Sequence, residues 1–325
     1  MSASFRSGAN VLLADLEADI SHQAVDLVAD DGAVSRGLLY RPRGQRPKVG
    51  VHLMHPRTDQ SRNYSIPPLV RAYRRTTYPH TAKVANSIII NSESLRTEVL
   101  TYLDVDPGKL RMVPEAVDHA TFQPGDPDEA RTHVERYAVD RPFVLFVSSL
   151  WPYKNLDGLL RAFALARPHL DGHQLAVVGP GRDDDYLANM HALARELGIA
   201  DDVVWVGGIP LEETVHFYRA ASAFAYPSFN ETFGLPILEA MACGCPVVTS
   251  DRSAMAETAG GAAVLADPES PESLADALVR ACGPQGAALR PRGLARAAEF
   301  SWARTGELTL DVYREAHRAK EKVRA

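Results

Sequence analysis

A chain of 325 residues is long enough for two domains of ordinary size, each with its own core. Its 46% hydrophobic and 23% charged residues are typical of a soluble globular protein, and a formal net charge of -6 excludes a general nucleic-acid binder. No apolar run approaches the roughly 20 residues that a membrane span requires. The three cysteines, Cys243, Cys245 and Cys282, form no even disulfide framework, so reduced thiols and a cytoplasmic location are expected.

One strand-then-helix unit is recognisable in the N-terminal third. Residues 87–90, Ser-Ile-Ile-Ile, are typical of a buried strand. The polar stretch 91–94 can cap a following helix, whose apolar residues Leu95, Val99 and Leu103 share one face. The pattern therefore predicts one βα unit in this part of the chain.

From Pro142 onward, short β-rich runs alternate with helical periodicity, which indicates βαβ units and a mostly parallel sheet covered on both faces. Strands are expected at 143–147, 175–178, 203–206, 223–226, 246–249 and 264–265. Helices are expected at 155–164, 186–197, 212–221, from 236, from 270 and at 301–316. The predicted fold class is therefore α/β.

Proline-punctuated stretches mark two connections. Residues 41–47 are expected to form a loop and residues 124–128 a linker, so we place the domain boundary near Asp140. The predicted organisation is an N-terminal lobe at 1–140, a C-terminal domain at 141–284 and C-terminal helices at 285–325.

The densest chemical signal is the segment 231–239, Glu-Thr-Phe-Gly-Leu-Pro-Ile-Leu-Glu, where the strand 223–226 gives way to the next helix. Gly234 lets the backbone approach a ligand, and free N–H groups at the helix start can receive a phosphate without a metal. Glu239, about one turn into the helix, can accept hydrogen bonds from ribose hydroxyls, and Glu231 can meet the hydroxyls of a sugar. The alternative is that each glutamate is only a solvated charge near a helix start. Ligands of open parallel sheets bind at the carboxyl ends of strands, where this segment lies, which favours the binding site.

Three further strand ends carry residues that suit the same ligand. Lys154 follows the first strand of the C-terminal domain and can neutralise a diphosphate leaving group, although an exposed structural lysine is the alternative. Gly179 and Gly181 allow a nucleotide close to the backbone, or form a commonplace turn. Backbone groups near Ile209 suit the edge of a base.

Taken together, these segments closely resemble the family-4 retaining glycosyltransferases of the GT-B fold. The likeness is carried by residues 147–155, 178–181, 227–228 and 231–239, with 85–93 and 113–118 in the N-terminal lobe, and it spans roughly residues 73–313. The resemblance implies a GT-B-like fold of two Rossmann-like lobes. The N-terminal lobe would face the acceptor, the C-terminal domain would bind a nucleotide-sugar donor, and the last helices would pack back toward the N-terminal lobe.

The resemblance also implies roles for individual residues. Lys154 would contact the phosphates and Glu231 the donor sugar, and these two are the candidate catalytic residues. The candidate donor-binding residues are Ser149, Gly179, Gly181, Ile209, Phe233, Gly234, Leu235 and Glu239. Of these, main-chain groups of residues 233–235 would hold the phosphates, Glu239 the ribose and Ile209 the base, and Ser149 stands where many members carry an arginine.

The N-terminal lobe departs from the family pattern and is expected to be shortened or atypical. Residues 36–72 resemble the first strands of an α/β-hydrolase, but no Gly-x-Ser-x-Gly nucleophile elbow follows, so hydrolysis is discounted. His55 and His80 are the acceptor-side candidates, and an ordinary surface or core histidine is the alternative for each.

The sequence therefore predicts a retaining glycosyltransferase that uses a UDP- or GDP-linked sugar and a glycan, lipid or small-molecule acceptor. Neither a metal nor another cofactor is expected, and nucleic acid is not an expected partner. Peripheral contact with the inner face of the membrane stays open, as does the oligomeric state. The alternatives are a non-catalytic nucleotide-sugar binding protein and a nucleotide-sugar epimerase of the same fold.

Overall fold

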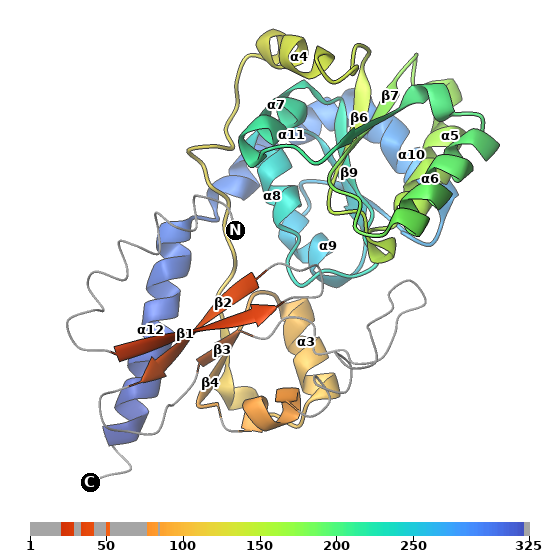
Figure 1. Cartoon of the computed structure of the whole chain (residues 1–325). Coiled ribbons are helices and arrows are strands. Elements are labelled where there is room, and N and C mark those ends of the chain that lie inside the picture. The colour runs from red at the N-terminus through yellow and green to blue at the C-terminus, as the bar shows by residue number, and fades with distance from the viewer. Residues whose placement is uncertain (1–20, 29–33, 42–49, 53–76, 84, 322–325) are drawn as a thin grey trace. The chain divides into compact units, whose positions relative to one another are not determined.

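The computed structural model describes residues 21–28, 34–41, 50–52, 77–83 and 85–321, with side chains at 77–83 and 85–316 (Figure 1). The chain divides into two compact units, Met1–Glu115 with Ser301–Ala325, and Ala116–Phe300. Outside the described residues lie residues 42–47 of the loop predicted at 41–47, the candidate His55, and residues 66–69 of the hydrolase-like stretch 36–72.

The second unit is built on a six-stranded sheet in the order β11-β10-β9-β6-β7-β8, with parallel pairing throughout. Its strands are β6 (Phe143–Val147), β7 (Gln174–Val178), β8 (Val203–Gly207), β9 (Ala223–Tyr226), β10 (Val247–Ser250) and β11 (Val264–Ala266). The chain runs outward from β6 to β8, returns to β9 on the other side of β6, and continues outward to β11. The winding direction therefore reverses between β6 and β9, as in doubly wound folds.

Helices cover both faces of this sheet (Figure 1). They are α4 (Pro127–Glu135), α5 (Leu156–Ala166), α6 (Asp184–Glu196), α7 (Leu211–Ala220), α8 (Leu235–Ala242), α9 (Ser253–Ala259), α10 (Pro271–Cys282) and α11 (Pro284–Ala298). Because strand side chains alternate in direction, Val144 and Phe146 of β6 join a core with α5, α6 and α10. Phe143 and Leu145 point the other way, into a core with α7, α8 and α9.

The strands and helices predicted for this unit are confirmed to within a few residues. Asn155 accepts a hydrogen bond from the Gly158 amide and so caps α5, as the sequence indicated. The predicted linker at 124–128 is partly wrong, because Asp126 caps α4 and Pro127 begins it. Helix α9 was not predicted, and α11 was expected only as part of the C-terminal helices at 285–325, without bounds of its own.

The first unit contains a three-stranded parallel sheet in the order β3-β4-β5 and a separate antiparallel pair, β1-β2. Its elements are β1 (Ser21–Val28), β2 (Val34–Arg41), β3 (Gly50–His52), β4 (Ser87–Ile90), α3 (Glu93–Tyr102), β5 (Leu110–Met112) and α12 (Trp302–Glu321). The strand, cap and helix predicted from residue 87 are confirmed, since Ser92 caps α3.

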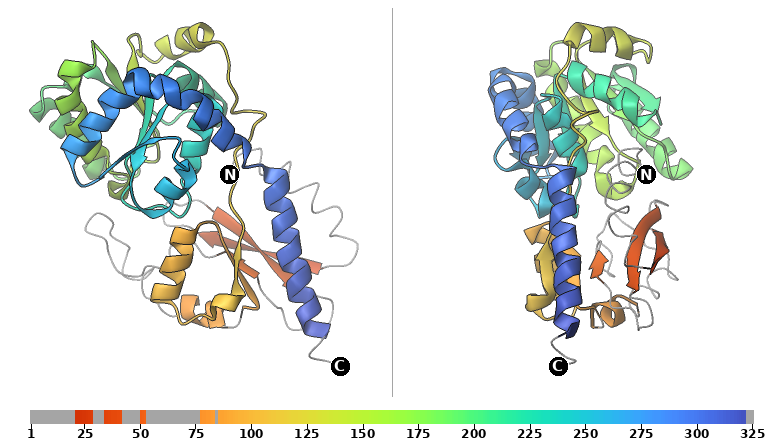
Figure 2. Two further views of the ribbon diagram at one scale, coloured as in Figure 1. Left: turned by 180° about the vertical axis from the view of Figure 1, so that it is seen from behind. Right: turned by 90° about the vertical axis from the view of Figure 1, so that its left-hand side faces the viewer.

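The C-terminal helix α12 belongs to this first unit and lies against β3 and β4 (Figure 2). Ile88 and Ile90 pack into a core with α3, and Ile89 packs on the other face with Val312 of α12. Arg111 of β5 donates two hydrogen bonds to the carboxylate of Glu315, which fixes the register of the helix.

Three further findings concern the described residues as a whole. No helix among them is both long enough and apolar enough to cross a membrane. They contain no group of three or more His, Cys, Asp or Glu residues placed to hold a metal ion. The three cysteines are free, and burial raises the pKa values of the Cys243 and Cys282 thiols to about 12, which makes both unreactive.

Candidate functional site

The predicted site residues follow two neighbouring strands at the point where the winding direction of the sheet reverses. Lys154 lies in the connection after β6, and Glu231 lies in the connection after β9. Because β6 and β9 are paired and parallel, both connections leave the same edge of the sheet. This carboxyl edge at the switch point is where open α/β sheets bind their ligands.

Lys154 and Glu231 form a buried ion pair. The Lys154 Nζ atom lies 2.6 Å from Oε1 of Glu231, and each side chain is only 11% exposed. Tyr226, the last residue of β9, completes the arrangement, since its hydroxyl lies 2.8 Å from both Nζ of Lys154 and Oε1 of Glu231. Burial by itself lowers the pKa of Lys154, but the Glu231 carboxylate outweighs it and holds that pKa above its ordinary value. The lysine is therefore a cation at neutral pH.

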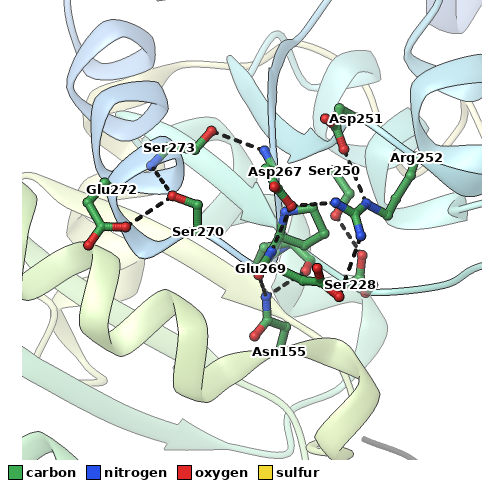
Figure 3. Close-up of polar contacts among 12 residues, drawn as sticks. Asn155, Ser228, Ser250, Asp251, Arg252, Asp267, Glu269, Ser270, Glu272 and Ser273 are labelled. Carbon is green, nitrogen blue, oxygen red and sulfur yellow. Dashed lines mark hydrogen bonds and ion pairs between the residues drawn. The ribbon is translucent and has the colours of Figure 1, made fainter. Parts of the chain in front are cut away.

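Asn155, the residue after this lysine, bonds to two neighbouring connections (Figure 3). Its backbone is in the left-handed region, with φ of 62°. Its side-chain amide donates to the carbonyl oxygens of Pro227, at 3.1 Å, and Pro268, at 2.7 Å. The connections after β6, β9 and β11 are thus joined through one buried residue adjacent to Lys154.

A second polar cluster joins the connections after β9, β10 and β11 (Figure 3). The Ser250 hydroxyl donates to the carbonyl oxygen of Ser228 at 2.5 Å. The Arg252 guanidinium donates to the Asp267 carboxylate and lies 3.7 Å from Glu269. These ion pairs are half-exposed, so their contribution is to geometry more than to stability.

Ser253 holds the backbone of the loop that carries Glu231. Its hydroxyl lies 2.7 Å from the carbonyl oxygen of Glu231, 3.2 Å from the amide nitrogen of Glu231 and 2.5 Å from Oδ1 of Asn230. Ser253 also has φ of 58°, a conformation that non-glycine residues adopt at some cost in strain. The loop is therefore positioned by a strained residue at the start of α9.

The start of α8 has the features expected of a phosphate site. Gly234 has φ of 91°, which favours glycine, and no side chain caps the helix there. Pro236 has no N–H, and the Ile237 amide bonds back to the carbonyl oxygen of Gly234 at 3.0 Å. Leu235 begins the helix, where amides lack helical partners. Phe233 beside it is buried and packs edge-on against Phe300, with ring centroids 5.8 Å apart.

Glu239 lies on α8, half-buried, and accepts a hydrogen bond from the Tyr218 hydroxyl at 3.1 Å. Tyr218 comes from α7 and is fully buried. Burial raises the pKa of Glu239 to about 7, and the hydrogen bond from Tyr218 opposes that rise. Glu239 is thus a carboxyl group that titrates near neutral pH, as is common at functional sites.

The remaining donor-side candidates lie along the same carboxyl edge. Gly179 has φ of 140°, and a Cβ there would lie 1.8 Å from the carbonyl oxygen of Ser148, so only glycine fits. Gly181 is exposed and forms a bridge with Leu150. Ser149, before the Lys154 turn, and Ile209, after β8, are half-buried.

The structure brings Lys154 and Glu231 into direct contact, whereas Glu239 is bonded to Tyr218. The sequence analysis did not identify Tyr226, Tyr218 or Ser253 as residues of the site. The position of Tyr226, a hydroxyl-bearing residue that ends a buried strand before Pro227, was the signal available for it. For Tyr218, on the buried face of α7, there was none. His80 is exposed within the helical residues 77–83 of the first unit, and its acceptor-side role stays a prediction.

Comparison with known proteins agrees with this geometry. Residues 129–283 match the family model described as glycosyl transferases group 1. This stretch, from α4 to the end of α10, is therefore similar to the glycosyl transferases of group 1.

Curated relatives are similar to this chain over more residues than the family model matches. A D-inositol 3-phosphate glycosyltransferase of Acidothermus cellulolyticus is 34% identical over 241 residues, which are 71% of this chain and 54% of that protein. The protein of that name from Frankia alni is 37% identical over 243 residues, 70% of this chain and 58% of that protein. The chain spans about half the length of the curated relatives it matches.

Solved structures show the same fold. A sucrose-phosphate synthase from Thermosynechococcus elongatus has a TM-score of 0.68 and 26% identity over 76% of this chain and 62% of that one. Anabaena Alr3699/HepE in complex with UDP and glucose has a TM-score of 0.69 and 20% identity, over 75% of this chain and 67% of that one.

Proposed function

We propose that this protein is a retaining glycosyltransferase of family-4 type, which transfers a sugar from a UDP- or GDP-linked donor to an acceptor. The observation that carries the proposal is the buried Lys154–Glu231 pair, 2.6 Å apart, at the switch point of the sheet. A buried ion pair is costly to desolvate, and its occurrence where such sheets bind ligands is best explained by chemistry.

The donor would lie along the carboxyl edge of the second unit. Main-chain amides at the start of α8 would receive the diphosphate, and Gly179 would let the nucleotide come close to the backbone. Glu239 would accept hydrogen bonds from ribose hydroxyls, and Glu231 from sugar hydroxyls. No metal ion or other cofactor is needed in this scheme, because cation and amides together neutralise the phosphates.

Lys154 would act on the leaving group. When the bond between the anomeric carbon and the diphosphate breaks, negative charge develops on the phosphate oxygens. A fixed, permanently charged lysine stabilises that charge more in the transition state than in the ground state, which is what lowers the barrier. The departing phosphate can then take the proton of the acceptor hydroxyl on the same face of the sugar, so that the anomeric configuration is retained.

The acceptor class is suggested by the relatives. Several are named D-inositol 3-phosphate glycosyltransferases, so we propose a hydroxylated small molecule of that kind as the first acceptor to test, ahead of glycans and lipids. His55 and His80 remain the acceptor-side candidates.

Calorimetry with UDP-glucose and GDP-mannose, followed by assays of hydrolysis and of transfer to D-inositol 3-phosphate, tests the proposal. The Glu239→Ala variant should lose donor affinity by about tenfold to a hundredfold, because a charged hydrogen-bond acceptor is removed. Its circular dichroism should match that of the wild type. Glu212→Ala, an exposed glutamate in the first turn of α7, is the matched control and should bind normally.

The other outcomes separate the alternatives. Binding without turnover would identify a non-catalytic binding protein, and interconversion of the donor sugar would identify an epimerase. Inversion of the anomeric centre in the product, followed by nuclear magnetic resonance, would rule out the retaining mechanism. Absence of any binding to either donor or to UDP and GDP would overturn the proposal.

A further inference from the structure

Each of the two site carboxylates has a hydrogen-bond donor from a buried tyrosine. Tyr226 is 2% exposed and Tyr218 is not exposed at all. Tyr226 lies 2.8 Å from Glu231, and Tyr218 lies 3.1 Å from Glu239. The tyrosines come from different elements, β9 and α7, so this repeated pairing does not follow from one local sequence pattern.

The direction of the hydrogen bonds is fixed by the groups involved. The Lys154 ammonium can only donate, so it donates to the Tyr226 oxygen at 2.8 Å. The single hydroxyl hydrogen of Tyr226 is then directed to Glu231. An ionised Glu239 can only accept, so Tyr218 donates to it. Burial holds the pKa values of both tyrosines well above their usual range, so both keep their hydrogen at neutral pH.

The two tyrosine rings are held by one aromatic residue between them. Phe224 packs edge-on against Tyr218, with ring centroids 5.2 Å apart, and stacks on Tyr226 at 5.8 Å. A ring that is packed in this way has little freedom to turn, so the place of its hydroxyl is set by the core of the unit. The two donors are therefore fixed relative to each other.

Only one oxygen of each carboxylate is engaged in these contacts. Lys154 and Tyr226 both meet Oε1 of Glu231, and Tyr218 meets Oε2 of Glu239. The second oxygen of each carboxylate is left to accept from a ligand. A carboxylate anchored through one oxygen can no longer rotate freely about its last torsion, which orients the other oxygen.

We infer that Tyr218 and Tyr226 are positioning residues of the donor site, which orient Glu239 toward the nucleotide end and Glu231 toward the sugar end of the donor. This inference rests on the proposed function. It predicts that the two tyrosines act on different steps, because they hold different ends of one ligand.

Tyr218→Phe and Tyr226→Phe remove the hydroxyls and keep the rings. Tyr218→Phe should weaken binding of both the nucleotide sugar and the free nucleotide by about tenfold. Tyr226→Phe should leave free UDP or GDP bound normally but lower kcat by about tenfold. Tyr137→Phe is the matched control, since it removes a hydrogen bond of 2.7 Å from a tyrosine to Glu213 in the same unit, and it should change neither quantity.

A pH profile provides a readout that a purely structural role would not move. The titratable groups that interact with Glu239 are Tyr218 on α7 and Cys243 at the end of α8. Tyr226 on β9 in turn interacts with Tyr218, and Arg219 on α7 interacts with Cys243. Tyr218 lowers the pKa of Glu239, so its removal should raise that pKa above about 7. As the pH is lowered from 9 to 6, donor affinity should therefore begin to fall at a higher pH in Tyr218→Phe than in the wild type, because the carboxylate that accepts from the ribose is protonated earlier.

The outcomes distinguish this inference from the proposed function. A wild-type protein that binds no nucleotide would overturn the function itself. The positioning role alone would be overturned if the wild type binds and turns over the donor and both tyrosine variants do so equally well. It would also be overturned if their losses of affinity and kcat were no larger than those of Tyr137→Phe. Equal losses of affinity and kcat in both variants, with an unshifted pH profile, would also overturn it.

Discussion

Removing Lys154 should destabilise the second unit, and removing its partner as well should restore much of the loss. In Lys154→Met the Glu231 carboxylate is left buried with only the Tyr226 hydroxyl. Breaking a buried pair from one side costs about 3–5 kcal/mol. Because each side chain is still 11% exposed and Tyr226 still donates, we expect about 2–3 kcal/mol.

The double variant Lys154→Met with Glu231→Gln leaves no charge to desolvate. Its loss should be well below the sum of the single losses, with a coupling free energy of about 1.5 kcal/mol or more. The exposed pair Arg280–Asp276, with side chains 46% and 65% exposed, is the control, and its coupling should be about 0.3–0.5 kcal/mol.

Urea unfolding at pH 7.5 measures these free energies. Trp151 and Trp205 lie in the second unit and Trp302 in the first, so fluorescence reports mainly on the unit that contains the pair. A multi-unit chain need not unfold in one step, so the fluorescence transition is compared with far-ultraviolet circular dichroism. Additive losses in the double variant would refute the reasoning, because they would mean that the two charges do not interact.

Two further predictions concern α8. Glu239→Gln should raise Tm by a few degrees at pH 8 and leave it unchanged at pH 4. The sign follows from the pKa of Glu239, which burial raises from 4.5 to about 7. The wild-type protein therefore has its full stability below pH 4.5 and loses part of it as the pH rises toward 7 and the carboxyl group ionises. Glutamine cannot ionise, so the variant does not lose this stability. An equal shift of Tm at both pH values would contradict this. Gly234→Ala should cost about 1–2 kcal/mol and weaken donor binding, since φ is 91° and the new Cβ would lie 3.1 Å from Cδ1 of Ile237. Gly198→Ala, with φ of 67° and nothing within 4 Å, should show the strain in urea unfolding but bind normally in calorimetry.

Periodicity predicted the parallel sheet because its strands are buried and its helices amphipathic. It gave no bounds for α11 within the helices expected at 285–325, because Gly286, Pro291 and Gly293 suggest a break there. Those glycines reflect close packing: a Cβ at Gly286 would lie 1.7 Å from the carbonyl oxygen of Ala281, and one at Gly293 would lie 3.2 Å from Cγ of Met241. Contacts between distant elements determine why glycine is needed at these positions, and a local sequence pattern does not show such contacts.

The site was predictable only in part, for the same reason. Residues 231–239 and Lys154 stand at strand ends, and strand ends can be located from the pattern of apolar runs. The partners of Glu231 and Glu239 come from other elements, and a tyrosine that serves as a hydrogen-bond donor looks like any other core aromatic in the sequence. Ser253 gave no signal, because its positive φ is a property of the folded backbone.

The concentration of unfavourable features at one edge of the sheet is itself an argument for function. Of the three non-glycine residues with positive φ among those described, Asn155 follows Lys154 directly and Ser253 holds the loop of Glu231. The same edge carries a buried ion pair and a carboxyl group whose ionisation is disfavoured. Apolar side chains of similar volume would in many proteins be as stable as a buried ion pair, or more so. Features that oppose stability therefore gather where two adjacent parallel strands end, which favours a binding function at that edge, and the rest of the unit holds the arrangement in place.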